Sequence, residues 1–147
     1  MGSGDGPLSD GEQRSRRAAM PELFASTPYL STLGLVVERY EPDAVTVRLP
    51  FRAELTNDGR AYHGGVVAAV IDTTGALAAW SNHDFDRGVR AATVALSIQY
   101  VAASDRADLV CRASTVRRAR ELIFTEVTAA DPTGRPVAHA VQTYRIT

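Results

Sequence analysis

The segment from Asn57 to Trp80 constrains the fold of this chain more than any other part of its sequence. It reads NDGRAYHGGVVAAVIDTTGALAAW, in which a polar loop leads into His63-Gly64-Gly65 and an apolar run follows, broken by one acid, Asp72. The run is too long and too rich in alanine for a strand, so it predicts a helix. Because that helix has no continuous polar face, other elements must bury it on nearly all sides.

Segments with the pattern of β-strands lie on both sides of this helix. Apolar and β-branched residues between turn residues predict strands over residues 33–40, 44–51, 90–102, 108–118, 122–130 and 136–146. The predicted order is a short helix, two strands, the long helix and four strands, which does not alternate as βαβ units do. The sequence therefore predicts the α+β class, with a curled antiparallel sheet of about five to six strands wrapped around the central helix.

The N-terminal end differs in composition from the rest of the chain. Residues 1–18 are mainly glycine, serine and charged residues, so we expect a mobile N-terminal tail without the apolar segment of a secretory signal. A short helix is predicted to begin at Pro21, because proline suits the first turn of a helix. With 147 residues, 45% of them hydrophobic, the chain is expected to fold as a single domain over residues 19–147.

Charge and cysteine content narrow the range of partners. The 16 basic and 17 acidic residues nearly cancel, which gives no reason to expect nucleic acid or an anionic membrane as a partner. The only candidate for a membrane span is the central run, where an acid at the bilayer centre would cost about 2.5 kcal/mol or more. A single cysteine, Cys111, excludes an intramolecular disulfide and favours a cytoplasmic location. Three isolated histidines and one cysteine give no metal-ligand spacing.

The residues on and around the long helix carry a specific resemblance. Asn57 lies six positions before His63 of the His-Gly-Gly sequence, Asp72 lies nine positions after that histidine, and Thr93 supplies a hydroxyl on the next predicted strand. With this set, residues 20–147 resemble the hotdog-fold thioesterases, in the PaaI-like branch of the phenylacetate pathway that also includes mammalian acyl-CoA thioesterases. The chain departs from the pattern where some relatives have serine in place of Thr93, which keeps the hydroxyl.

The resemblance implies a hydrolase that acts on an acyl-CoA substrate without a separate cofactor. It also implies a homodimer, or a homotetramer built as a dimer of dimers. A second departure, Ala119 where relatives often have glycine, does not affect the proposed chemistry.

The residue types suit thioester hydrolysis independently of the resemblance. A helix N-terminus presents unpaired backbone N–H groups and a partial positive charge, and Gly64 and Gly65 let an oxygen approach closely. We predict that the Gly65 N–H stabilises the oxyanion that forms on the thioester carbonyl. Asp72 then acts as nucleophile or as general base, and Thr93 holds the attacking water or the carboxylate. Asn57 and His63 complete the predicted catalytic set.

Helical spacing adds a constraint on this site. Gly65 and Asp72 are separated by a rise of about 10 Å along a helix, so one chain is not expected to place both on the same carbonyl. If both act on one thioester, they come from different subunits of a two-fold dimer. The sequence thus predicts active sites that are shared between subunits.

A basic cluster and two other classes of function complete the hypotheses. Arg117, Arg118 and Arg120 could clamp the phosphates of coenzyme A, since guanidinium groups bind phosphate in a bidentate manner, or they could form a solvated strand end. A hotdog hydratase or dehydratase would use a similar helix and pocket with a different acid. A noncatalytic acyl-CoA-binding module would not need Asp72. The sequence does not distinguish an aromatic from an aliphatic acyl group.

Overall fold

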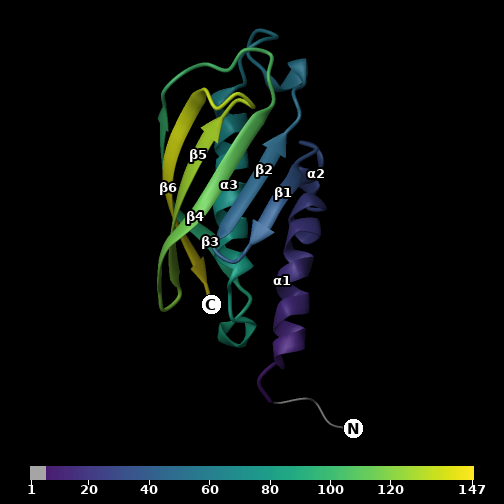
Figure 1. Ribbon diagram of the computed structural model, residues 1–147, viewed down its shortest axis with the longest axis vertical. Coiled ribbons are helices and arrows are strands. Elements are labelled where there is room, and N and C mark those ends of the chain that lie inside the picture. Colours follow the sequence, from purple (N-terminus) through teal and green to yellow (C-terminus); the bar gives the residue numbers. More distant parts are fainter. Residues whose placement is uncertain (1–5) are drawn as a thin grey trace.

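One long helix, α3 (Gly64–Ser81), lies against a single curled sheet in the computed structural model, which describes residues 6–147 (Figure 1). The sheet has six strands, all antiparallel, in the order β1-β2-β4-β5-β6-β3. The strands are β1 Val36–Glu41, β2 Ala44–Leu49, β3 Ala91–Tyr100, β4 Leu109–Ala119, β5 Leu122–Ala130 and β6 Pro136–Ile146. The predicted α+β class is confirmed, and each predicted strand is present close to its predicted bounds.

Helix α3 is buried most completely in its C-terminal half, where every residue from Thr73 to Ser81 is buried. By length and hydropathy α3 could cross a membrane, but 67% of it is buried within this domain, as expected for a core helix. Thr73 Oγ1 donates to Ala69 O at 2.7 Å, and Thr74 Oγ1 donates to Val70 O at 2.6 Å, so both hydroxyls are satisfied. The N-terminal half of α3 is less covered.

A long N-terminal helix, α1 (Asp10–Ala25), corrects the expectation of a mobile tail. A capping box closes its first turn, because the Ser9 hydroxyl accepts from the Glu12 N–H and the Glu12 carboxylate accepts from the Ser9 N–H. Residues 10–18 of the predicted tail are therefore helical. Residues 1–5 of that tail lie outside the described part of the chain.

Polar contacts attach α1 to the 3-10 turn η2 (Phe85–Arg87) that follows α3. Gln13 Nε2 donates to Asp84 Oδ1 at 2.9 Å. Arg17 Nε donates to the carbonyl of His83 at 2.8 Å. Because these anchoring side chains are polar, the composition of this segment did not distinguish a docked helix from a solvated tail.

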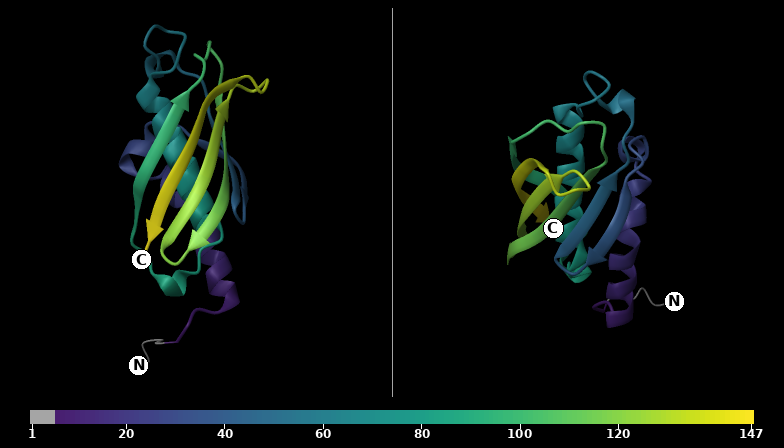
Figure 2. Two further views of the ribbon diagram at one scale, coloured as in Figure 1. Left: turned by 90° about the vertical axis from the view of Figure 1, so that its left-hand side faces the viewer. Right: turned by 45° about the horizontal axis from the view of Figure 1, so that its top comes forward.

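The helix predicted to begin at Pro21 is the C-terminal part of α1. Proline removes one backbone donor there, and α1 nevertheless continues through it. A second short helix, α2 (Pro28–Ser31), starts with Pro28 in its first turn. Helix α1 packs against α3 on the side that the sheet leaves open (Figures 1 and 2).

Strand β3 forms one edge of the sheet, and within residues 6–147 it pairs only with β6. None of its 10 residues is buried, and Val94 and Tyr100 expose 58% and 53% of their surface. Figure 2 shows β3 at the border of the sheet beside α3. A long edge of this kind offers backbone N–H and C=O groups to a further strand.

Candidate active site

The Asp72 carboxylate lies midway along α3 and is held through one of its oxygens. Thr93 Oγ1, on β3, donates to Asp72 Oδ1 at 2.6 Å, and Gln142 Nε2, on β6, donates to the same oxygen at 2.7 Å. Within residues 6–147, Oδ2 accepts no hydrogen bond. Asp72 and Thr93 line a cavity of about 310 Å³ whose other walls come from the end of α1, α2, neighbouring turns of α3 and Tyr144 on β6. One oxygen therefore fixes the carboxylate, and the other is left for water or substrate.

Gln142 is a site residue that the sequence reasoning missed. It is 2% exposed, and besides the Asp72 carboxylate its amide donates to the Asp72 carbonyl at 2.9 Å. Its own Oε1 accepts from Thr125 Oγ1, on β5, at 3.2 Å. The sequence does contain a pattern that could have identified Gln142. On β5 and β6, Thr125 and Gln142 fall at positions that point toward the core, and the other residues at such positions are mostly apolar. A polar residue at such a position needs a partner in the core, and here the partner is Asp72.

Gly75 makes room for this amide. A Cβ atom at Gly75 would lie 2.4 Å from Gln142 Oε1 and 3.0 Å from Thr125 Oγ1. Only glycine lets the β6 amide approach the helix closely enough to reach Asp72, one turn earlier. Gly75 therefore helps to position the carboxylate, although it does not line the cavity of Asp72.

The His-Gly-Gly sequence forms the N-terminus of α3. His63 is the N-cap residue, and its Nδ1 accepts from the Gly65 N–H at 2.8 Å. An accepting Nδ1 carries no proton, so this hydrogen bond fits the tautomer with its proton on Nε2. A Cβ atom at Gly65 would lie 2.9 Å from Nδ1, which explains the second glycine. The prediction that the Gly65 N–H is a free oxyanion donor is wrong, because the histidine that precedes it takes this donor.

The backbone N–H of Gly64 is the donor that remains for an oxyanion at this helix N-terminus. Within residues 6–147 its N–H has no hydrogen-bond acceptor, as expected for the first helical position. Tyr100 Oη donates to the Gly64 carbonyl at 2.7 Å, which fixes the first turn of α3 against the end of β3. Gly64, Asn57 and Tyr100 line a second cavity, of about 380 Å³, and the Asn57 side chain is exposed there.

One chain thus separates the predicted catalytic residues into two groups. Asn57 and Gly64 line the cavity at the start of α3, whereas Asp72 and Thr93 line a different one, and the two cavities share no residue. Eight helical residues between Gly64 and Asp72 correspond to a rise of about 12 Å. A site that is shared between two subunits stays a prediction.

Arg118 has a structural role at the C-terminal end of α3, and its role in phosphate binding stays a prediction. Its guanidinium donates to Asp43 Oδ1 at 2.7 Å, to the Ala79 carbonyl at 3.0 Å and to the Ala78 carbonyl at 3.2 Å. Burial of Asp43 opposes ionisation, but hydrogen bonds from Arg118 and Asn82 outweigh it and lower the pKa of the carboxyl. Arg118 thereby satisfies carbonyls of the last turn of α3.

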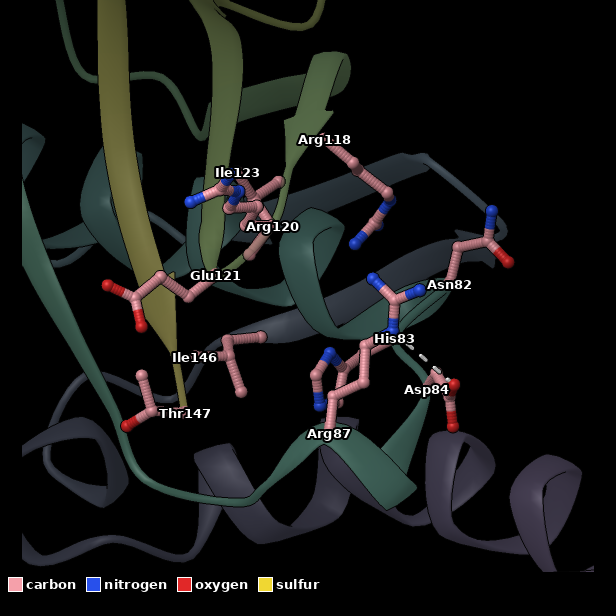
Figure 3. Close-up of a pocket in the computed structure, with 10 residues that line it drawn as sticks. All are labelled: Asn82, His83, Asp84, Arg87, Arg118, Arg120, Glu121, Ile123, Ile146 and Thr147. Atoms are coloured by element: carbon pink, nitrogen blue, oxygen red, sulfur yellow. Dashed lines mark ion pairs between the residues drawn. The ribbon is translucent and has the colours of Figure 1, made fainter.

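Arg117 does not share a cavity with the other two arginines. Arg118 and Arg120 line a cavity of about 560 Å³ beyond the C-terminal end of α3, but Arg117 does not. In Figure 3 the side chains of Arg118 and Arg120 extend in different directions from the turn between β4 and β5. The three arginines of the predicted cluster therefore do not all face one cavity.

Other reactive groups are not arranged for catalysis. Burial raises the pKa of the Cys111 thiol to about 12, so it stays protonated in the core. His139 is exposed and pairs with Glu126 at 2.8 Å on the outer face of the sheet. In the described part of the chain, no group of three or more His, Cys, Asp or Glu residues could hold a metal ion.

The fold and the carboxylate on its central helix define a hotdog-fold protein of the thioester-hydrolase class. Residues 61–138, more than half of the chain, match the Thioesterase superfamily, so the chain belongs to that superfamily. A protein of Halobacterium salinarum to which esterase activity is ascribed is 34% identical over 106 residues, which make up 70% of each chain.

Two solved structures show the same fold. The PaaI protein of E. coli, from the phenylacetic acid degradation operon, has a TM-score of 0.78 at 16% identity, over 95% of this chain and 96% of that chain. A hypothetical thioesterase of Streptococcus pneumoniae, whose structure contains coenzyme A, has a TM-score of 0.69 at 23% identity, over 78% of this chain and 86% of that chain. The resemblance to hotdog-fold thioesterases is thus confirmed, since the superfamily match shows the family and the likeness to PaaI shows the fold.

The contact between Gly75 and Gln142 predicts the effect of one methyl group. Gly75→Ala should lower the free energy of unfolding by about 1–3 kcal/mol, because the new Cβ displaces a buried amide. Urea-induced unfolding measures this loss. Gly11→Ala, on α1, is the matched control, since the nearest atom to its Cβ is 4.0 Å away and alanine favours helices. Equal unfolding midpoints for Gly75→Ala and wild type would show that the amide adapts at no cost.

The contacts of Arg118 predict a loss of stability without a loss of substrate affinity. Arg118→Met should lower the free energy of unfolding by about 1–3 kcal/mol, because Asp43 and two carbonyls lose their donor. Arg117→Met, at an exposed position, should leave stability unchanged. Thermal unfolding and the KM for acyl-CoA are measured together. A raised KM with unchanged stability in Arg118→Met would support the phosphate-binding role.

Proposed function

We propose that this protein is an acyl-CoA thioesterase, which hydrolyses the thioester of an aryl- or fatty acyl-CoA. The observation that carries the proposal is the Asp72 carboxylate, fixed through Oδ1 by Thr93 and Gln142 and free at Oδ2, at the wall of a largely apolar cavity. The coenzyme A in the streptococcal structure supports this class of substrate. The reaction needs only water as its second substrate.

Asp72 supplies the base or the nucleophile. As a base, Oδ2 takes a proton from water while the water oxygen attacks the thioester carbonyl carbon. The tetrahedral intermediate then collapses, the C–S bond breaks, and the thiolate of coenzyme A receives the proton from Asp72. As a nucleophile, Oδ2 attacks the carbonyl carbon, the C–S bond breaks, and the acyl group is held as an anhydride while coenzyme A leaves as a thiolate. Water then hydrolyses the anhydride, which releases the free acid, restores the Asp72 carboxylate and supplies the proton that the thiolate takes up. In both routes, Thr93 and Gln142 orient the carboxylate.

The oxyanion that forms on the carbonyl needs donors, and Gly64 is the candidate in place of Gly65. Its N–H lies at the positive end of α3, and donors of this kind contribute a factor of about a hundred or more to the rate. The Asn57 side chain lines the same cavity. His63 acts through the Gly65 N–H, which it caps, and so sets the shape of this first turn.

The two groups of residues meet if two copies of the chain pair through β3. Asp72 contacts Thr93 at the start of β3, and Gly64 contacts Tyr100 at its end. Antiparallel pairing of two β3 edges about a two-fold axis would place the Gly64 end of one chain beside the Asp72 end of the other. The unpaired and exposed edge of β3 supports this homodimer.

Release of free thiol from acyl-CoA substrates tests the proposed activity. The wild-type protein should hydrolyse decanoyl-CoA or phenylacetyl-CoA, and Asp72→Asn should lower kcat by about a hundredfold or more with an unchanged circular dichroism spectrum. Asp10→Asn, at an exposed position on α1, is the control and should keep full activity.

The same assay separates the alternatives. A hydratase would consume the double bond of a 2-enoyl-CoA without releasing thiol, and a noncatalytic binding module would do neither. Turnover of Asp72→Asn at the wild-type rate would remove this residue from the mechanism.

Complementation between two inactive variants tests the shared site. Asp72→Ala removes the carboxylate, and Gly64→Pro removes the N–H at a helical position where proline is tolerated. When the two variants are co-expressed, a mixed dimer should contain one intact site. With random mixing, about a quarter of wild-type activity is the expected ceiling.

Native mass spectrometry establishes whether mixed dimers have formed. If they form and no activity returns, the N-terminus of α3 and Asp72 do not act on the same carbonyl across an interface. Each variant alone should remain inactive.

A further inference from the structure

The cavity beside Asp72 continues into a larger one along α3. The larger cavity measures about 630 Å³ and shares four lining residues with the cavity of Asp72: Phe24, Thr27, Leu30 and Tyr144. Along α3, the floor passes from Asp72 through Ala76 to Trp80. These positions lie four residues apart on one face of the helix, so the two cavities form a single groove about 12 Å long. We call it the acyl groove.

The walls of the acyl groove are apolar. Helix α1, α2 and the segment from η2 to β3 supply most of them, through Met20, Leu23, Phe24, Leu30, Phe85 and Val89. Leu23 and Val89 are 57% and 60% exposed, so large apolar side chains face an open groove there. The stacked rings of Trp80 and Phe85, with centroids 5.4 Å apart, line its far part.

The neutral polar groups in the far part of the groove are already paired with one another or with the backbone. Trp80 Nε1 donates to Tyr144 Oη at 3.3 Å, and Thr27 Oγ1 donates to the Phe24 carbonyl at 2.9 Å. Burial raises the pKa of Tyr144, so its phenol stays neutral. The one charged lining residue there, Arg16, lies over the Phe85 ring at 6.0 Å. A hydroxyl among the apolar walls of the groove would find few partners.

We propose that the acyl groove binds the acyl part of the substrate, and that this part is a long apolar chain or ring system without hydroxyl groups. The inference rests on the proposed thioesterase function, since it starts from a thioester carbonyl at Asp72. A volume of this size is typical of pockets for small molecules, and an acetyl group would leave most of the groove empty. Helix α1 thereby becomes a determinant of specificity.

A series of acyl-CoA substrates from acetyl to dodecanoyl tests the proposal. In the wild-type protein, kcat/KM should rise by about fourfold for each added methylene until the groove is filled. A hydroxyl at the far end of decanoyl-CoA should lower kcat/KM by about tenfold or more, because it loses water without gaining a partner.

Two adjacent alanines on α1 provide a matched pair of variants. Ala19 lines the acyl groove, whereas Ala18 is exposed and lines none of the cavities. Ala19→Trp should fill the groove, lower kcat/KM for decanoyl-CoA by about tenfold or more, and leave acetyl-CoA unaffected. Ala18→Trp should behave like the wild type on the whole series. If Ala19→Trp does not fold, Leu23→Asn, at an exposed position, should weaken the dependence on chain length.

The outcomes separate this inference from the proposed function. A flat dependence on chain length in the wild type, or equal losses on acetyl- and decanoyl-CoA in Ala19→Trp, would overturn the acyl groove while leaving hydrolysis intact. A change in oligomeric state in Ala19→Trp, measured by analytical ultracentrifugation, would mean that a second copy covers the groove and would also overturn it. No thiol release from any substrate by the wild type would instead reject the thioesterase function.

Discussion

The structure depends on a carboxylate placed in the middle of an apolar core helix. An acid in that position loses water as the sheet closes over the helix, so it needs hydrogen-bond donors from the elements packed against it. Thr93 supplies one from the edge strand and Gln142 supplies another from β6. Gly75 is required so that the amide can come close enough. Fold and chemistry are thus linked, because the same contacts fill the core and orient Asp72.

The second constraint is the length of α3. Backbone donors are available only at its N-terminus, whereas Asp72 lies about two turns further along, so one chain carries two incomplete halves of a site. The edge strand β3 contacts both halves, at Thr93 and at Tyr100. In the proposed homodimer, the two β3 edges pair about the two-fold axis, and this pairing has two consequences. It pairs the open backbone groups and brings the halves together.

Helix α1 shows how polar anchoring can position an apolar surface. Its contacts with the turn after α3 are made by Gln13 and Arg17, while Met20 and Phe24 on the same helix face the side of α3. The helix therefore stays in place without sealing the space beside Asp72 completely. That space is the proposed acyl groove, and its walls on α1 come mainly from residues that follow the predicted tail.

The sequence by itself determined the central helix, the six antiparallel strands and the positions of Asp72, Thr93, Asn57 and the His-Gly-Gly sequence, because these follow from local periodicity and spacing. Tertiary structure alone decided the partners of those residues. Gln142 reaches Asp72 across 70 positions of the chain, and Arg118 caps the end of α3 from a strand about 40 positions away. The loss of the Gly65 donor to His63 is local, but it depends on a ring orientation that residue spacing does not encode. Periodicity shows which face of an element is buried, whereas hydrogen bonds inside the core depend on which strands become neighbours.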